Sequence, residues 1–306
     1  MERIQNKEGF EIFTEKIKAA MEQHYGGSFT VEVKEVMKNN GVIITGLSVK
    51  ENSRTACPTV YLESFYEQYE DGRSLSSIVE ELIEVFEKND ILEPEELDFF
   101  TDYEKVKPKL SIKLINRAYN SKLLEDVPYR DFLDMAIVCL VEVDVKDKVT
   151  GSILVRNNHI CMWGVKADRL LDDAIEQFRL NKNITITDIV DVVDEIHRSI
   201  FTGGDIPADY YARDMMYVVS TGQQTFGAAV LALPETVGII AAKVKTDYYV
   251  IPSSIHELIV LPCRLGDDRE ALDEMIRSVN GSMLKKEEIL SDHAYRYIVK
   301  KEAICW

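Results

Sequence analysis

The sequence predicts an α+β protein with mixed or largely antiparallel sheets, helices packed on one side of them, and two lobes. Apolar residues recur at three- and four-residue steps in some segments and alternate with polar residues in others, so both helices and strands are expected. Towards the C-terminus the strand-like segments outnumber the helical ones. Several of them follow one another too closely for a helical crossover, which favours antiparallel pairing.

The first lobe is expected over residues 1–107. It begins with a helix over residues 9–24, because the apolar residues of this segment fall on one helical face. Alternating residues on either side of Asn40 and Gly41 then predict a hairpin, since this pair favours a primed turn. A third strand is expected over residues 58–62.

Acidic residues are concentrated in one window of this lobe. The chain has 36 basic and 53 acidic residues, a net charge of −17, and residues 51–100 hold 3 of the basic and 14 of the acidic ones. A helix is expected from Ser74, its N-cap, to Lys88, with an acidic outer face beside a tyrosine-rich strip. The face is either a solvated surface or a contact surface for a protein partner or a second copy of the chain. The candidate contact residues are Tyr66, Tyr69, Glu80, Glu81, Glu84 and Glu87.

Charge and cysteine usage exclude several classes of protein. The strongly negative surface repels the phosphate backbone of nucleic acids and the anionic headgroups of lipids. Neither nucleic acid nor a membrane is therefore expected as a partner. The chain shows no signal-peptide pattern and no run of about 20 apolar residues that would span a bilayer. Five cysteines without a CxxC pair fit reduced thiols. We therefore expect a cytoplasmic protein with no cofactor and no metal.

The second lobe is expected over residues 108–306, with the joint between the lobes within residues 89–109 or near Pro128. The apolar run over residues 132–145 predicts a strand that is buried on both faces for much of its length. The elements expected after it are an antiparallel strand over 148–156, helices over 157–163 and 170–178, strands at MMYVVS, GAAVLALP, YYVIPSS and HELIVLP, helices over 235–243 and 267–279, and a last strand at AYRYIV.

Polar residues gather at two points between these C-terminal strands. Ser254, His256 and Glu257 follow one another closely, and histidine beside a hydroxyl and a carboxylate is the material of acid–base or nucleophilic catalysis. Asp292 and His293 precede the last strand, where they would complete such a site if the fold brought them to His256. The alternative is a hydrogen-bonded turn, which such a pattern forms more often than a catalytic site.

Several ordered segments resemble a known family. They are NNGVIITGLSV, PTVYLESFYEQYEDGRSL, DVPYRDFLDMAIVCLVEV, NNHICMWGV, MMYVVS with GAAVLALPETV, YYVIPSSIHELIVLP and LSDHAYRY, and together they cover nearly the whole chain. They resemble domain of unknown function 5688, a family of gut Clostridia-type bacteria. The resemblance implies no activity, cofactor or catalytic residue that can be carried over.

The first functional hypothesis is a non-catalytic protein that acts by binding a protein partner or itself. It follows from the concentrated acidic charge and from the lack of a specific catalytic motif. The second is a hydrolase that uses His256 with Ser254, Glu257 or Asp292. The third is an accessory protein of a phage or mobile element, which only the distribution of such families suggests.

Overall fold

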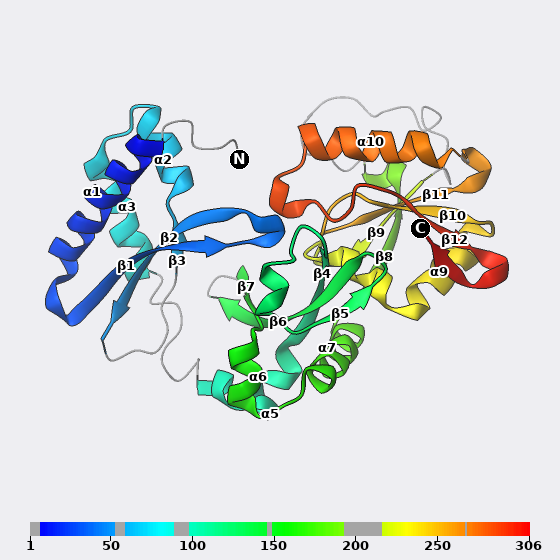
Figure 1. The fold of residues 1–306 in the computed structure, drawn as a ribbon, viewed down its shortest axis with the longest axis horizontal. Coiled ribbons are helices and arrows are strands. Elements are labelled where there is room, and N and C mark those ends of the chain that lie inside the picture. The colour runs from blue at the N-terminus through cyan, green and yellow to red at the C-terminus, as the bar shows by residue number, and fades with distance from the viewer. Residues whose placement is uncertain (1–6, 53–58, 89–97, 146–148, 193–215, 267) are drawn as a thin grey trace. The chain divides into compact units, whose positions relative to one another are not determined.

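The computed structural model divides into two compact units (Figure 1). The first contains residues 1–106 and 143–151, and the second contains residues 107–142 and 152–306. Residues 143–151 thus group with the first unit, although they lie within the second lobe expected from the sequence. The residues described are 7–52, 59–88, 98–145, 149–192, 216–266 and 268–306, so residues 89–97 of one expected joint lie outside them.

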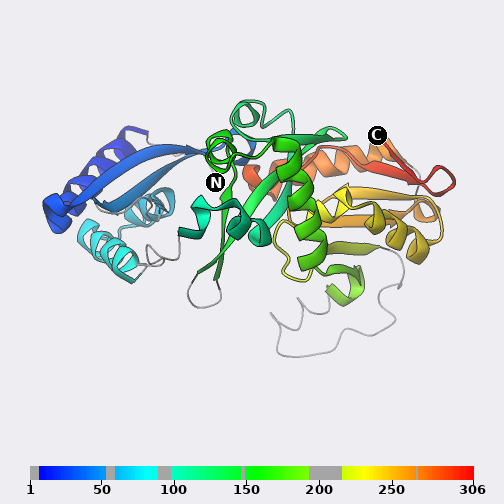
Figure 2. The ribbon, with the colours of Figure 1, turned by 90° about the horizontal axis from the view of Figure 1, so that it is seen from below.

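The first unit contains a three-stranded antiparallel sheet with helices packed beside it. The strand order is β1-β2-β3, and Figure 2 shows the helices beside the sheet. The core lies between them and takes large apolar side chains from three of the helices, including Phe13, Phe65 and Leu82. The elements are α1 (Lys7–Tyr25), β1 (Phe29–Met37), β2 (Ile43–Glu51), β3 (Thr59–Tyr61), α2 (Glu63–Glu70) and α3 (Leu75–Lys88).

Two local predictions in this unit are confirmed. Asn40 (φ 57°, ψ 32°) and Gly41 (φ 65°) both have left-handed backbones, and the Val42 N–H donates to the Asn39 carbonyl at 3.3 Å, as in a primed turn. The Ser74 hydroxyl accepts a hydrogen bond from the backbone N–H of Ser77 at 3.3 Å, which makes it the N-cap of α3.

The second unit holds a four-stranded sheet built around the long strand β6 (Met135–Val145). β4 (Leu110–Asn116) and β5 (Tyr129–Phe132) pair with β6 on either side, and β7 (Val149–Leu154) pairs with it as well. β6 is buried from Met135 to Val141, as the sequence predicted.

The apolar run over residues 132–145 is not a single strand, however. Phe132 ends β5 and pairs with Met135 of β6, so Leu133 and Asp134 form a two-residue turn between them. Leu133 has a φ of 56°, which lets the chain reverse in so short a loop. The apolar residues on both sides conceal this reversal in the sequence.

A six-stranded antiparallel sheet forms the remainder of the second unit. Its order is β13-β12-β10-β11-β9-β8, so neighbours in the sheet are often distant in the sequence. The strands are β8 (Ile184–Asp188), β9 (Tyr217–Thr221), β10 (Tyr248–Pro252), β11 (Leu258–Pro262), β12 (Tyr295–Ile298) and β13 (Ala303–Cys305).

Helices lie on both faces of this sheet rather than on one side only (Figure 1). Tyr249 and Ile251 of β10 pack with Ile276 of α10 (Arg269–Ser282). Tyr248 faces the other way, and its hydroxyl donates to a carbonyl of α9 (Pro234–Val244) at 3.1 Å. Successive residues of a strand point to opposite faces, so β10 contacts a helix on each side.

The segment GAAVLALP, expected as a strand, is a short 3-10 helix over Gly227–Ala232. Ala229 and Leu233 donate backbone hydrogen bonds three residues back, to Phe226 and Val230. An apolar run this short and fully buried has no period that would distinguish a helix from a strand, which is why the prediction was wrong. This unit also contains the helices α6 (Asn157–Trp163) and α7 (Ala167–Asn181), whereas the short helix α5 (Tyr103–Val106) belongs to the first unit.

Candidate functional site

His256 lies in the connection between β10 and β11, held by the loop that follows β9. The backbone N–H of Phe226 donates to Nδ1 of His256 at 3.2 Å, and the two rings stack with centroids 5.5 Å apart. The carbonyl of His256 accepts a hydrogen bond from the Ser220 hydroxyl at 2.8 Å. The ring and the backbone of this histidine are therefore both fixed to residues at the end of β9.

These contacts favour the neutral form of His256. Its Nδ1 lone pair accepts a backbone hydrogen bond, so a neutral ring carries its proton on Nε2. Burial lowers the pKa of His256 and outweighs the opposite influence of Glu288. A neutral ring with this tautomer offers a donor at Nε2 rather than a free base.

The polar neighbours of His256 form a hydrogen-bonded turn. The Ser254 hydroxyl accepts from the backbone N–H of His256 at 3.0 Å, and the Ser253 hydroxyl donates to Glu257 at 3.2 Å. Neither serine hydroxyl forms a hydrogen bond with the imidazole ring. Among the described residues, no hydrogen bond or ion pair joins Asp292 to His256 either.

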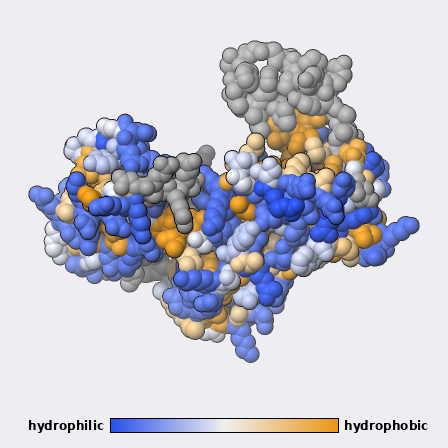
Figure 3. Space-filling model, turned by 45° about the horizontal axis from the view of Figure 1, so that its top comes forward, coloured by the Kyte–Doolittle hydropathy of each residue, from blue (hydrophilic) through white to orange (hydrophobic). Residues whose placement is uncertain are grey.

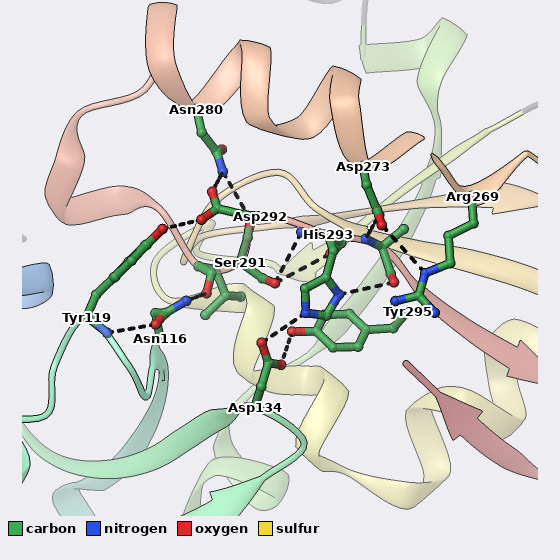
Figure 4. A network of polar contacts seen from close by, with 12 residues as sticks. Asn116, Tyr119, Asp134, Arg269, Asp273, Asn280, Ser291, Asp292, His293 and Tyr295 are labelled. Carbon is green, nitrogen blue, oxygen red and sulfur yellow. Dashed lines mark hydrogen bonds and ion pairs between the residues drawn. The ribbon is translucent and has the colours of Figure 1, made fainter. Parts of the chain in front are cut away.

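His293 belongs to a second polar network, which centres on Asp134 (Figure 4). Nε2 of His293 lies 3.0 Å from one carboxylate oxygen of Asp134, and the Tyr295 hydroxyl donates to the other at 2.5 Å. Nδ1 of His293 lies 3.3 Å from the carbonyl of Ala294. The turn between β5 and β6 is thereby joined to the beginning of β12.

The electrostatics of this pair favour a charged histidine and a charged aspartate. The hydrogen bond with Asp134 raises the pKa of His293, against the effect of burial. Burial alone would raise the pKa of Asp134, but hydrogen bonds from His293 and Tyr295 outweigh it and lower this pKa. Burial and the neighbouring carboxylate together raise the pKa of Tyr295, so its hydroxyl stays a donor.

Asp292 points away from this pair, although it adjoins His293 in the sequence (Figure 4). Its carboxylate accepts one hydrogen bond from the hydroxyl of Tyr119 and another from the amide of Asn280 at 2.8 Å. The same Asn280 amide donates to the carbonyl of Ser291 at 3.0 Å. Asp292 thus fastens the segment before β12 to α10, and its partners are neutral.

The glutamates expected on the outer face of α3 differ in their contacts. Glu80 and Glu84 are exposed. Glu81 forms an ion pair with Arg73 at 2.5 Å, and Glu87 lies 3.4 Å from Nε2 of His24. Hydrophilic residues make up most of the visible surface of each unit (Figure 3).

Tyr66 and Tyr69, which the sequence predicted for the same contact surface, are less exposed than Glu80 and Glu84. Tyr66 is 2% exposed and packs edge-on against Phe10 in the core of the first unit, so it is not available to a partner. Its position on α2 faces the helices, and its ring fills the space between them. Tyr69 is partly buried, and its ring centroid lies 5.2 Å from that of Phe13.

Sequence reasoning missed the residues that complete the second network. Asp134, Tyr119 and Tyr295 come from three separate places in the chain and meet only in the folded unit. The signal for Asp134 was a single charged residue inside the apolar run FLDMAIV, where a turn or a buried partner is expected. No comparable signal marked Tyr119.

Within the ranges that the structure describes, no group of three or more histidine, cysteine, aspartate or glutamate side chains is placed to hold a metal ion. No helix in those ranges is long and apolar enough to cross a bilayer.

Residues 10–298 match the model of a family of unknown function (DUF5688), so the chain belongs to this family. Comparison with curated proteins and with solved structures found no match.

Proposed function

We propose that this member of the DUF5688 family is a non-catalytic, cytosolic binding protein that takes a basic protein partner on the outer face of α3. The observation that carries the proposal is the pair of exposed glutamates, Glu80 and Glu84, one helical turn apart. Both side chains present negative charge to solvent on the same face of the helix. A lysine or arginine of a partner placed beside them would be attracted by both carboxylates.

The surroundings of this pair support a contact surface of limited size. Glu81 and Glu87 flank it and contact Arg73 and His24, respectively. The helix beneath is held by Ile78, Leu82 and Phe86, which are buried at four-residue steps. The acidic side chains therefore stand on a helix that is fixed to the core of the first unit, and a rigid helix loses little entropy on binding.

The hydrolase hypothesis has less support. A general base needs a free lone pair within reach of a nucleophile, whereas Nδ1 of His256 accepts the N–H of Phe226. The Ser254 hydroxyl contacts a backbone N–H and not the imidazole. For His293, both ring nitrogens lie beside acceptor oxygens, Asp134 on one side and Ala294 on the other.

The test compares two charge reversals of equal size. Glu80→Lys/Glu84→Lys alters the proposed surface, and Glu11→Lys/Glu15→Lys makes the same change on an exposed face of α1. Calorimetric titration with a lysine-rich peptide at low salt measures binding to each full-length protein. We expect the α3 variant to lose about tenfold in affinity, which is about 1.4 kcal/mol, because each glutamate contact contributes up to about 1 kcal/mol.

The α1 variant is expected to bind like the parent chain, apart from a small common loss due to the changed net charge. Equal losses in both variants would mean that the peptide responds to the total charge of the chain and not to α3, and the proposal would then be wrong. Circular dichroism of both variants checks that the helices remain folded.

A further inference from the structure

We propose that His293 is a pH-sensitive latch: its imidazolium form holds the turn between β5 and β6 beside β12, and loss of one proton releases the turn. The latch lies wholly within the second unit, because Asp134, His293 and Tyr295 all belong to it. It is independent of the binding surface proposed on α3, which belongs to the first unit.

The geometry around the imidazole carries this inference. Nε2 lies 3.0 Å from a carboxylate oxygen of Asp134, and Nδ1 lies 3.3 Å from the carbonyl oxygen of Ala294. Both neighbours are acceptors, and a neutral imidazole has only one N–H to donate. Only the imidazolium satisfies both contacts. The neutral ring must leave one acceptor facing its lone pair.

Charged and aromatic side chains surround the imidazole of His293. From α10, Asp273 accepts the backbone N–H of Ala294 at 2.7 Å and lies 3.6 Å from Arg269. The Trp306 ring stacks on His293 with centroids 5.8 Å apart. The carboxylate of Asp292 is turned towards Tyr119 and Asn280 (Figure 4). The titratable and charged groups around the ring are therefore Asp134 from the turn, Tyr295 from β12, Asp273 and Arg269 from α10, and the adjoining Asp292.

The turn between β5 and β6 has an unfavourable backbone conformation, which favours its movement when the contact with His293 is lost. Leu133 occupies the left-handed region (φ 56°) in the two-residue turn, a conformation that costs an L-residue about 1–2 kcal/mol. β5 is a short edge strand with partly exposed residues throughout. After His293 loses its proton, the turn keeps the hydrogen bond from the Tyr295 hydroxyl to the Asp134 carboxylate and a backbone hydrogen bond in which the Arg117 N–H donates to the Asp134 carbonyl at 3.3 Å. Release is therefore expected to be local.

The sign of the pH dependence follows from the direction of the shift. Asp134 raises the pKa of His293 above its ordinary value of about 6.5. A raised pKa in the folded state means that the contact stabilises the turn fully below the ordinary pKa, and that this contribution is lost as the pH rises through the folded-state pKa. The turn is thus closed in mildly acidic solution and opens on the alkaline side.

Hydrogen exchange of the backbone amides of residues 132–136, measured by NMR on the full chain, tests the latch. The side-chain carbon signals of His293 report its titration in the same samples. After correction for the intrinsic pH dependence of exchange, protection in the parent chain should fall about fivefold as His293 loses its proton, since a partly exposed ion pair contributes up to about 1 kcal/mol.

Two variants separate the latch from general effects of pH. Asp134→Asn removes the charged acceptor, so protection should be low throughout and show no step. Asp131→Asn makes the same charge change on β5, at a residue paired with Arg117 (3.1 Å), and should retain the step. Should Asp134→Asn fail to fold, His293→Gln replaces it, and its protection should also be independent of pH. A parent chain without the step, or a step that persists in Asp134→Asn or His293→Gln, overturns the inference.

Discussion

Replacing Gly227 by alanine should destabilise the second unit, because this glycine lies closer to its neighbours than any side chain permits. An added Cβ would collide with the hydroxyl of Ser220 and come within 2.5 Å of the His256 carbonyl oxygen and 2.8 Å of the Thr221 nitrogen. The two backbone atoms belong to β9 and to the connection between β10 and β11. They cannot retreat without disturbing the sheet.

The magnitude follows from two contributions. Overpacking a filled core costs about 1–3 kcal/mol. The Ser220 hydroxyl would also have to rotate away from the His256 carbonyl, to which it donates at 2.8 Å, and a lost hydrogen bond costs about 1 kcal/mol. A total of about 2–4 kcal/mol lowers the melting temperature of a domain of this size by about 4–16 °C.

Differential scanning calorimetry of the full chain measures this shift, with Gly238→Ala as the matched control. Gly238 is exposed within α9, and a Cβ there would meet nothing within 4 Å. Because alanine favours a helix by about 0.5–1 kcal/mol over glycine, the control should melt slightly higher. A Gly227→Ala protein that melts with the parent chain would contradict the close approach and the backbone around His256.

Two further predictions concern single side chains. Burial raises the pKa of the Cys139 thiol and keeps it protonated, so iodoacetamide should label exposed Cys161 and Cys305 in the native protein while leaving Cys139 unmodified; equal labelling of Cys139 would contradict its burial. Ser74→Ala removes the hydrogen bond to the Ser77 N–H, so urea unfolding of the first unit should show a loss of about 1 kcal/mol, and an unchanged midpoint would mean that the cap contributes nothing.

Turns and helix ends that depend on a few neighbouring residues were predictable from the sequence. The hairpin at Asn40-Gly41 was predictable because this pair adopts the left-handed backbone that a primed turn needs. Ser74 was identifiable as an N-cap because the apolar periodicity of α3 begins directly after it. The end of α6 at Trp163-Gly164 was equally clear, since Gly164 takes a left-handed conformation there.

Elements that depend on tertiary contacts were predicted less well. The 3-10 helix over Gly227–Ala232 consists of small apolar residues that fit a buried strand equally well, and only the close approach of Gly227 to β9 determines the conformation. The turn at Leu133 was hidden because a leucine rarely adopts a positive φ. The order of the six-stranded sheet depends on pairings between distant strands, which periodicity does not encode.

In the candidate site, too, the sequence indicated single residues, whereas their partners depend on tertiary contacts. Composition and spacing identified His256, Asp292 and His293 as residues that needed an explanation, but the partners of each are set by the sheet order. β12 lies beside β10, and the β5–β6 turn meets the start of β12, so His293 pairs with Asp134 across 159 residues of sequence. Asp292 and His293 adjoin each other and nevertheless serve different contacts, because the chain bends at these two residues.

The hydrogen-bond partners of His256 and His293 affect the protonation of the two rings in opposite ways. In the connection between β10 and β11, Nδ1 of His256 accepts a backbone N–H, and burial keeps the ring neutral. Before β12, His293 faces two acceptors, and the carboxylate of Asp134 keeps it charged. The two environments thus shift the pKa of the same side chain in opposite directions within one unit, by a donor in one case and by acceptors in the other. A titration in which His256 kept its proton to a higher pH than His293 would contradict both hydrogen-bonding arrangements.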